Sequence, residues 1–252
     1  MNNSLWNTLN DLKKHKWVDL THKFGPDTPR FASFDPAKFE TLFTYKDGFF
    51  VKQYTFAGQY GTHLDPPVHF AEGGRYLDEL GLKELVLPLV NIDLSEKVNK
   101  NNDYVMTVDD ILEWEKKYGK IPEGSFVAFR SDWSKRWPDQ DSKICPDQDK
   151  FLNLDKGGNE HYPGWSLEAL KFLYETRKIS ANGHETFDTD APIKQQKTGF
   201  QGEYYVLKED HYQIEVMANL DKVPPTGSII FSIVPKVEKA PGFPVRSFAI
   251  IP

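Results

Sequence analysis

The chain has 252 residues, and its 31 lysines and arginines nearly balance its 37 aspartates and glutamates, with no basic stripe that would favour nucleic acid as a partner. Aromatic residues make up 14% of the chain, which argues against disorder, and the single cysteine, Cys145, excludes an internal disulfide. The N-terminus lacks the features of a signal peptide and no apolar run approaches the ~18 residues of a membrane span, so we expect a cytoplasmic protein without membrane contact.

The first half of the chain combines short helices and strands. In chain order we predict a helix at 4–14, strands at 17–24, 49–56 and 85–94, and a helix at 107–119. Thr107 and Asp110 can form the capping box that begins the last of these helices. Pro88 lies near the middle of the strand at 85–94, and because proline cannot donate to a ladder, we place this strand at an edge or a bulge.

The second half contains more strands and one further helix. In chain order we predict a strand at 125–130, a polar surface loop at 134–164, a helix at 166–177 and strands at 178–183, 212–220, 228–235 and 245–251. Ser166 suits the N-cap of the helix. Strands outnumber helices and no internal repeat is present, so we expect one α/β domain with a mixed sheet over residues 1–252.

The stretch QYGTHLDPPVHF, residues 59–70, concentrates polar side chains that can bind a metal. His63 and Asp65 are two positions apart, so an extended backbone points both to one face. Gly61 permits the bend that brings Gln59 towards the same centre, and the two prolines after Asp65 stiffen the backbone. With His69 nearby, this pattern fits a divalent-metal site and, on spacing alone, equally a hydrogen-bonded polar cluster at a turn.

GTHLDPPVHF resembles the signature of the cyclase family of metal-dependent hydrolases, which includes bacterial kynurenine formamidases and isatin hydrolases. DLTHKFGPDTPRF, FVAFRSDWSKRW, YPGWSLEALKFL, GHETFDTD and the segment 214–250 resemble other parts of that family in the same order, so the likeness covers most of residues 17–252. The resemblance implies a swivelling β/β/α-type fold with a mixed sheet, a homodimer or homotetramer, and hydrolysis of a C–N amide bond by a Zn²⁺ or Mn²⁺ enzyme.

The resemblance also implies roles for individual residues. His63, Asp65 and Glu215 match metal ligands, and His69 matches a catalytic base or, in members with two metals, a ligand. Gln59 stands where the family has a histidine, and we expect its amide oxygen to serve as a ligand. The resulting oxygen-rich set predicts one divalent metal, with Mn²⁺ favoured over Zn²⁺.

Glu203 also departs from the pattern, because formamidases carry a histidine twelve residues before the position of Glu215. Its two interpretations are a catalytic proton acceptor beside the metal and a plain surface glutamate. In GHETFDTD, Glu185 and Asp188 are candidates for the substrate pocket or for carboxylates that cap a turn. Phe70, like the other aromatic residues near these motifs, fits either a pocket wall or the core.

These residues predict a hydrolase that cleaves the C–N bond of a small aromatic or cyclic amide. A metal-activated water attacks the carbonyl, while His69 takes a proton and returns it to the leaving nitrogen. The same site would also suit a lactone or ester hydrolase. A further alternative is a protein that binds a metal or small ligand without catalysis.

Overall fold

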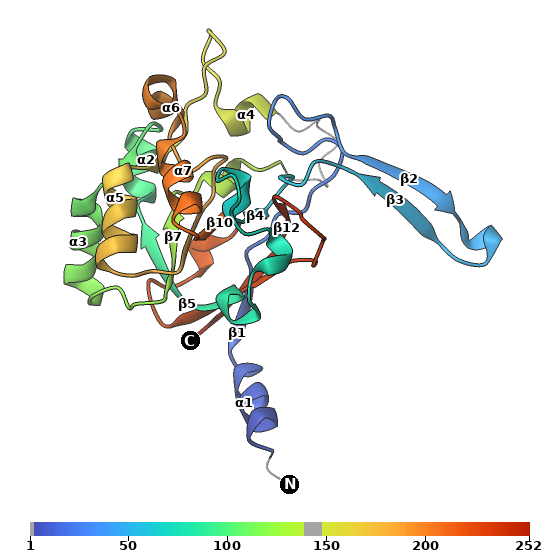
Figure 1. The fold of residues 1–252 in the computed structure, drawn as a ribbon, viewed down its shortest axis with the longest axis horizontal. Coiled ribbons are helices and arrows are strands. Elements are labelled where there is room, and N and C mark those ends of the chain that lie inside the picture. The colour runs from blue at the N-terminus through green and yellow to red at the C-terminus, as the bar shows by residue number, and fades with distance from the viewer. Residues whose placement is uncertain (1–2, 139–147) are drawn as a thin grey trace.

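The computed structural model describes residues 3–138 and 148–252, and a nine-stranded mixed sheet runs through its centre (Figure 1). The strand order is β1-β13-β11-β5-β7-β9-β10-β4-β12. The strands are β1 (Lys16–Asp19), β4 (His63–Asp65), β5 (Val86–Asp93), β7 (Phe126–Arg130), β9 (Ala181–His184), β10 (Tyr212–Glu215), β11 (Ser228–Ile233), β12 (Phe243–Pro244) and β13 (Arg246–Ile251). The four strands from β5 to β10 are parallel, and the pairs that flank them are antiparallel, which confirms the expected mixed α/β fold.

Helices cover one face of this sheet, where α3, α5 and α7 lie side by side (Figure 1). The helices are α1 (Ser4–Leu12), α2 (Ser95–Lys100), α3 (Val108–Tyr118), α4 (Gln148–Leu152), α5 (Leu167–Lys171), α6 (Pro192–Thr198) and α7 (Gln201–Lys208). Side chains of β7 alternate between two cores: Val127 and Phe129 pack towards the helices, whereas Phe126 and Ala128 join the cluster on the opposite face. A strand buried on both faces explains the continuous apolar run at this position.

The helix at residues 108–118 confirms the capping prediction. The Thr107 hydroxyl accepts a hydrogen bond from the backbone of Asp110, whose carboxylate in turn accepts one from the backbone of Thr107. The edge prediction for residues 85–94 is wrong, because β5 lies between β11 and β7. The ladder between β5 and β7 begins only at Leu89, so Pro88 precedes it and pairs with β11 alone.

The segment 134–164 is not the simple surface loop that we expected. Phe151 and Tyr162 are buried, and β8 (Gly164–Trp165) pairs with β6 (Val105–Met106). Cys145 lies outside the described residues. The sequence patterns also missed α6 and α7, and α7 carries Glu203.

Two further elements extend from the main body. Strands β2 (Lys38–Phe43) and β3 (Val51–Thr55) form a two-stranded ribbon that projects to one side, and α1 projects below the sheet (Figure 1). Helix α1 has no buried residue. Across residues 3–138 and 148–252, no helix is both long and apolar enough to span a membrane.

Candidate active site

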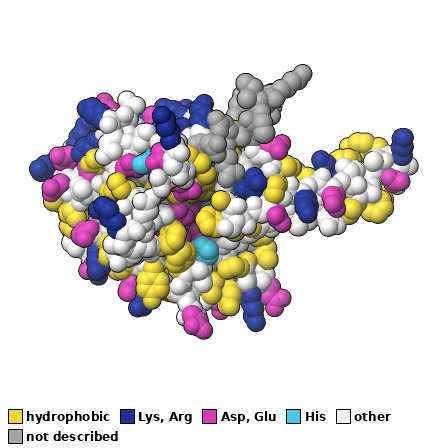
Figure 2. Space-filling view, turned by 90° about the horizontal axis from the view of Figure 1, so that it is seen from above, with side chains coloured by type: hydrophobic (Ala, Val, Ile, Leu, Met, Phe, Trp, Pro, Cys, Tyr) yellow, Lys and Arg dark blue, Asp and Glu magenta, His cyan; other side chains and the backbone are white. Residues whose placement is uncertain are grey.

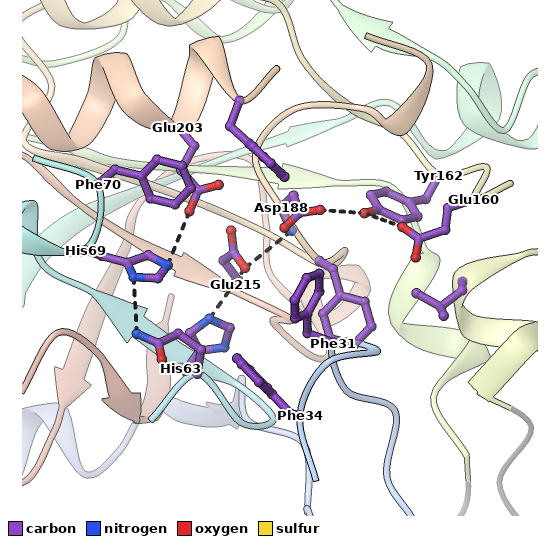
Figure 3. Close-up of a pocket in the computed structure, with 14 residues that line it drawn as sticks. Phe31, Phe34, His63, His69, Phe70, Glu160, Tyr162, Asp188, Glu203 and Glu215 are labelled. Atoms are coloured by element: carbon purple, nitrogen blue, oxygen red, sulfur yellow. Dashed lines mark hydrogen bonds and ion pairs between the residues drawn. The ribbon is translucent and has the colours of Figure 1, made fainter. Parts of the chain in front are cut away.

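The pairing of β4 with β10 builds the floor of the site. These strands are antiparallel, with Asp65 opposite Gln213 and His63 opposite Glu215. Because alternate residues of a strand share a face, this register places all four side chains on one surface. His69 comes from the short turn Pro67–His69 that follows β4, and Glu203 comes from α7. Sequence-distant residues thus meet at one point (Figure 3).

The imidazole ring of His63 lies between three hydrogen-bond acceptors, a backbone carbonyl on one side and two carboxylates on the other. Its Nδ1 lies 2.8 Å from the carbonyl oxygen of Gly61, which can only accept, so Nδ1 carries the proton. The other ring nitrogen, Nε2, lies 3.3 Å from Asp65 Oδ2 and 3.4 Å from Glu215 Oε2, and in the neutral ring it turns a lone pair towards them. Two carboxylates and a lone pair at this spacing repel one another unless a cation lies between them.

The surroundings of Asp65 support the same conclusion. Its side chain is fully buried, and neither carboxylate oxygen has a hydrogen-bond partner among the described residues. A buried carboxylate without partners is costly, whereas coordination of a metal ion satisfies it. His63, Asp65 and Glu215 offer donor atoms within 4.8 Å of one another, and this set of one imidazole and two carboxylates fits a divalent cation.

Opposing effects set the charge of His63 and Glu215. Burial alone would lower the pKa of His63, but Asp65 and Glu215 raise it well above its usual value. Burial alone would raise the pKa of Glu215, but its contacts with His184 and His63 hold that pKa below its usual range. In the absence of a metal, a proton on His63 therefore takes the place that a cation would fill.

A second group of acidic and imidazole side chains adjoins the first. His69 Nε2 lies 3.9 Å from Glu203 Oε1 and 4.0 Å from Asp65 Oδ1. Burial and the charges of Glu215, Asp188 and Asp65 raise the pKa of Glu203 well above its usual value. Asp65 is thus shared between the two groups, while Glu203 is buried rather than at the surface.

Gln59 reaches the same place through its amide. Its Nε2 donates to the carbonyl of Pro241 at 3.0 Å and lies 3.4 Å from His69 Nδ1, which leaves the amide oxygen as the atom that could bind a metal. The backbone of Gly242 closes this side: a Cβ there would lie 2.2 Å from Gln59 Nε2 and 2.9 Å from Asp65 Oδ1. Only glycine fits this approach without displacing the two side chains.

These polar groups form one end of a cavity of about 310 Å³, whose other walls are mostly apolar (Figure 3). The apolar side chains that line it are Phe31, Phe34, Phe70, Leu152, Phe187 and Phe200. The rings of Phe70 and Phe200 meet edge to face at 5.7 Å. In the space-filling view, a histidine and acidic side chains reach the surface between hydrophobic ones (Figure 2). An aromatic cavity with a polar end suits a small, flat, mostly apolar ligand.

Known proteins share both the sequence and this architecture. The model of the Cyclase family, described as "Putative cyclase", matches residues 18–191. The chain is 32% identical to an isatin hydrolase of Roseibium aggregatum over 250 residues, which covers 93% of this chain and 91% of the relative. It belongs to the cyclase family.

Two solved structures superpose closely on the fold. Isatin hydrolase A from Labrenzia aggregata, bound to benzyl benzoate, has a TM-score of 0.88 at 29% identity and covers 98% of this chain and 99% of that one. An isatin hydrolase bound to the product analogue thioisatinate has a TM-score of 0.89 at 27% identity and covers 100% and 99% of the two chains. The predicted resemblance is confirmed, and with it the expected class, a metal-dependent hydrolase.

Within this cyclase-family site, the structure brings together all six residues to which we assigned metal or catalytic roles. Gln59, His63, His69, Glu203 and Glu215 line the cavity, and Asp65 lies beneath them. Their individual roles stay predictions.

The pocket candidates divide into two groups. Phe70 and Asp188 line the cavity, and burial together with the charge of Glu215 raises the pKa of Asp188 to about 7. Glu185 does not belong to the described lining: its carboxylate accepts hydrogen bonds from Ser131 and Ser134, and burial raises its pKa to about 7. The backbone bends between Glu185 and Asp188, and the two carboxylates contact different residues, Ser131 and Ser134 in one case and Tyr162 in the other.

Sequence reasoning missed several residues of the site. Phe34, Phe187, Phe200 and Tyr162 line the cavity, yet none belongs to a pattern that distinguishes a pocket wall from a core position. Gln213 was missed as well, although it lies two residues before Glu215 in a strand. That spacing places both on one face, which is the same signal that paired His63 with Asp65.

Proposed function

We propose that this protein is a metal-dependent hydrolase that opens the C–N bond of a small cyclic amide fused to an aromatic ring, the chemical class to which isatin belongs. The observation that carries this proposal is the convergence of His63 Nε2, Asp65 and Glu215 at the polar end of an aromatic cavity. The names of the relatives, isatin hydrolases, support the same substrate class.

His63, Asp65 and Glu215 would hold the divalent cation, with the amide oxygen of Gln59 as a further ligand. A cation held there would lower the pKa of water and polarise the substrate carbonyl. Three of these four groups offer oxygen, which favours Mn²⁺ over Zn²⁺. We therefore propose one Mn²⁺ as the cofactor.

His69 and Glu203 form the pair that handles the proton. Their facing atoms, Nε2 and Oε1, lie 3.9 Å apart, and both residues line the cavity. We assign to this pair the acceptance of a proton from the attacking water and its delivery to the leaving nitrogen. Phe31, Phe70 and Phe200 orient the flat ring and exclude bulk water, so that the carbonyl faces the polar end.

A substrate panel tests this proposal. The Mn²⁺-loaded protein is offered isatin, an N-formyl arylamine and an aromatic lactone, and ring opening or deformylation is followed by absorbance. We expect the highest kcat/KM for the cyclic amide. Preference for the lactone would indicate an esterase, and stoichiometric metal binding without turnover of any of the three would indicate a binding protein.

The projecting ribbon suggests how copies of the chain associate. Its large exposed hydrophobic residues are Leu42, Phe43, Tyr45, Phe49, Phe50, Val51 and Tyr54. An isolated two-stranded ribbon is only marginally stable in water, and so many exposed aromatics favour a partner. The ribbon carries both signs of charge, as in Lys52 and Glu40, which suits a self-complementary interface. We propose a second copy of this chain as the partner, in a homodimer or homotetramer.

The cytoplasmic location expected from the sequence stays a prediction. Fractionation of cells that express the protein at its natural level would test it.

A further inference from the structure

Gln213 lies at the centre of the site without touching the cavity. It is fully buried in β10, between β9 and β4. Its amide nitrogen donates one hydrogen bond to Glu203 Oε1 and one to Glu215 Oε1, both at 3.0 Å. A primary amide has two N–H groups, so one side chain can bridge both carboxylates.

Thr189 fixes which way this amide points. The Thr189 hydroxyl, itself fully buried, donates to the carbonyl oxygen of Gln213. If the amide turned over, its oxygen would face the two carboxylates and both hydrogen bonds would be lost. The hydroxyl therefore selects the orientation that presents the two N–H groups to Glu203 and Glu215.

The two carboxylates depend on this bridge to different degrees. Glu215 also accepts a hydrogen bond from the backbone of Asp188 and contacts His63. For Glu203, Gln213 is the one hydrogen-bond donor to the carboxylate in the part of the chain that the structure describes. Two acidic groups so close together repel each other, and donors placed between them offset that repulsion.

We propose that Gln213, oriented by Thr189, is a positioning residue that fixes the separation of Glu203 and Glu215. The proposal rests on the proposed function, in which Glu215 binds the metal and Glu203 shares the proton. The two hydrogen bonds from Gln213 hold Glu215, the proposed metal ligand, and Glu203, the proposed proton acceptor, at a fixed separation. An ionised carboxylate accepts hydrogen bonds and cannot supply them, so Glu203 needs a donor such as the Gln213 amide.

Substitutions at Thr189 test this role without changing either carboxylate. T189V keeps the shape of the side chain but removes the hydroxyl, whereas T189S keeps the hydroxyl. T186V provides a matched control in the same segment, because Thr186 is equally buried and its hydroxyl contacts the carbonyl of Pro163 instead of Gln213. Q213M removes the amide itself at nearly constant length.

Mn²⁺ affinity is measured by calorimetry, and kcat and KM are measured on the same preparations. We expect T189V and Q213M to lose about 10- to 100-fold in Mn²⁺ affinity, with kcat lowered more than KM is raised, while T189S and T186V stay within about twofold of the wild type. Circular dichroism of the metal-free proteins confirms that each variant is folded.

Two outcomes would overturn the positioning role. In one, T189V and a folded Q213M bind Mn²⁺ and turn over substrate as the wild type does. In the other, T189S loses as much affinity as T189V, which would point to packing rather than to the hydroxyl. A wild type that binds Mn²⁺ but hydrolyses no amide would refute the proposed function alone, because the ratios of metal affinity would still decide the role of Gln213.

Discussion

The floor of the site and the projecting ribbon differ in which kind of side chain they expose to water. At the site, Asp65, Glu203 and Glu215 are acidic groups buried almost completely. On the ribbon, Phe43 and Phe50 are large aromatic side chains exposed to about half of their surface, at 43% and 49%. Each arrangement is unfavourable for an isolated chain.

In the proposed function, each region needs a component from outside the chain, and the two components differ in kind. Three acids buried this close together favour a bound cation, since positive charge offsets their mutual repulsion more fully than neutral hydrogen-bond donors do. Exposed aromatics call for an apolar surface. These two requirements can be separated, because changes at the site should leave assembly intact and changes on the ribbon should leave metal binding intact.

The largest effect is expected from D65N. The neutral amide cannot replace the carboxylate shared by both groups of the site, so hydrolysis should fall to background and Mn²⁺ binding should be lost. Calorimetric metal titration and steady-state kinetics measure both effects, and circular dichroism of the metal-free variant checks that it is folded. Retained Mn²⁺ binding in D65N would contradict the ligand assignment.

H69A should lower kcat by about 10²- to 10⁴-fold, the usual contribution of a positioned proton-transfer group, while metal content stays at the wild-type level. The measurement is steady-state kinetics with metal analysis of the same sample. Loss of metal in parallel with activity would make His69 a ligand, and unchanged kcat would remove it from catalysis. E203Q should act in the same direction if the two residues work as a pair.

Paired substitution of ribbon aromatics, F43S with F50S, should weaken self-association and spare the site. If these side chains together contribute about 4 kcal/mol to the interface, the dissociation constant of the oligomer rises by about 10³-fold. Sedimentation across a concentration series measures it, and Mn²⁺ affinity per chain should not change. An oligomer as stable as that of the wild type would place the interface elsewhere.

The smallest effect is expected from E185Q, a buried acid outside the cavity. Burial raises the pKa of Glu185 from 4.5 to about 7, so its protonated form stabilises the fold at acidic pH. That contribution is complete below about pH 4.5 and is lost as the pH rises through 7, by at most about 3 kcal/mol. Stability should therefore fall from pH 5 to pH 8 more steeply in the wild type than in E185Q.

Urea unfolding of the metal-free proteins at both pH values measures this difference. The exposed residue Glu123 provides the control variant E123Q, which should follow the wild type. Parallel pH dependence in E185Q and the wild type would show that Glu185 does not titrate in this range.

The sequence could predict which neighbouring residues share a face, but not which distant segments the fold brings together at the site. His63 and Asp65 are two residues apart on a strand, so their shared face follows from the spacing alone. Glu215 meets them only through the pairing of β4 with β10, which short-range patterns do not specify. Glu203 required α7, a helix whose weak apolar periodicity gave no clear signal. Glu203 and Glu215 are therefore assigned from the family resemblance and not from local patterns.

The errors in the fold have a similar origin. A proline confines a strand to an edge only where the strands on both sides pair at its position. Here the ladder between β5 and β7 begins one residue after Pro88. The polar segment 134–164 contains Phe151 and Tyr162, whose burial depends on the helices and strands around them. Local composition describes the surface of such a segment but not the few side chains that anchor it.

In the proposed function, a divalent cation binds between His63, Asp65 and Glu215. Anomalous diffraction from crystals of the Mn²⁺-loaded protein, collected on both sides of the manganese absorption edge, locates the cation. We expect one strong manganese peak within bonding distance of His63 Nε2 and of an oxygen from each of the two carboxylates. A fully loaded protein whose manganese lies away from these three side chains would contradict it.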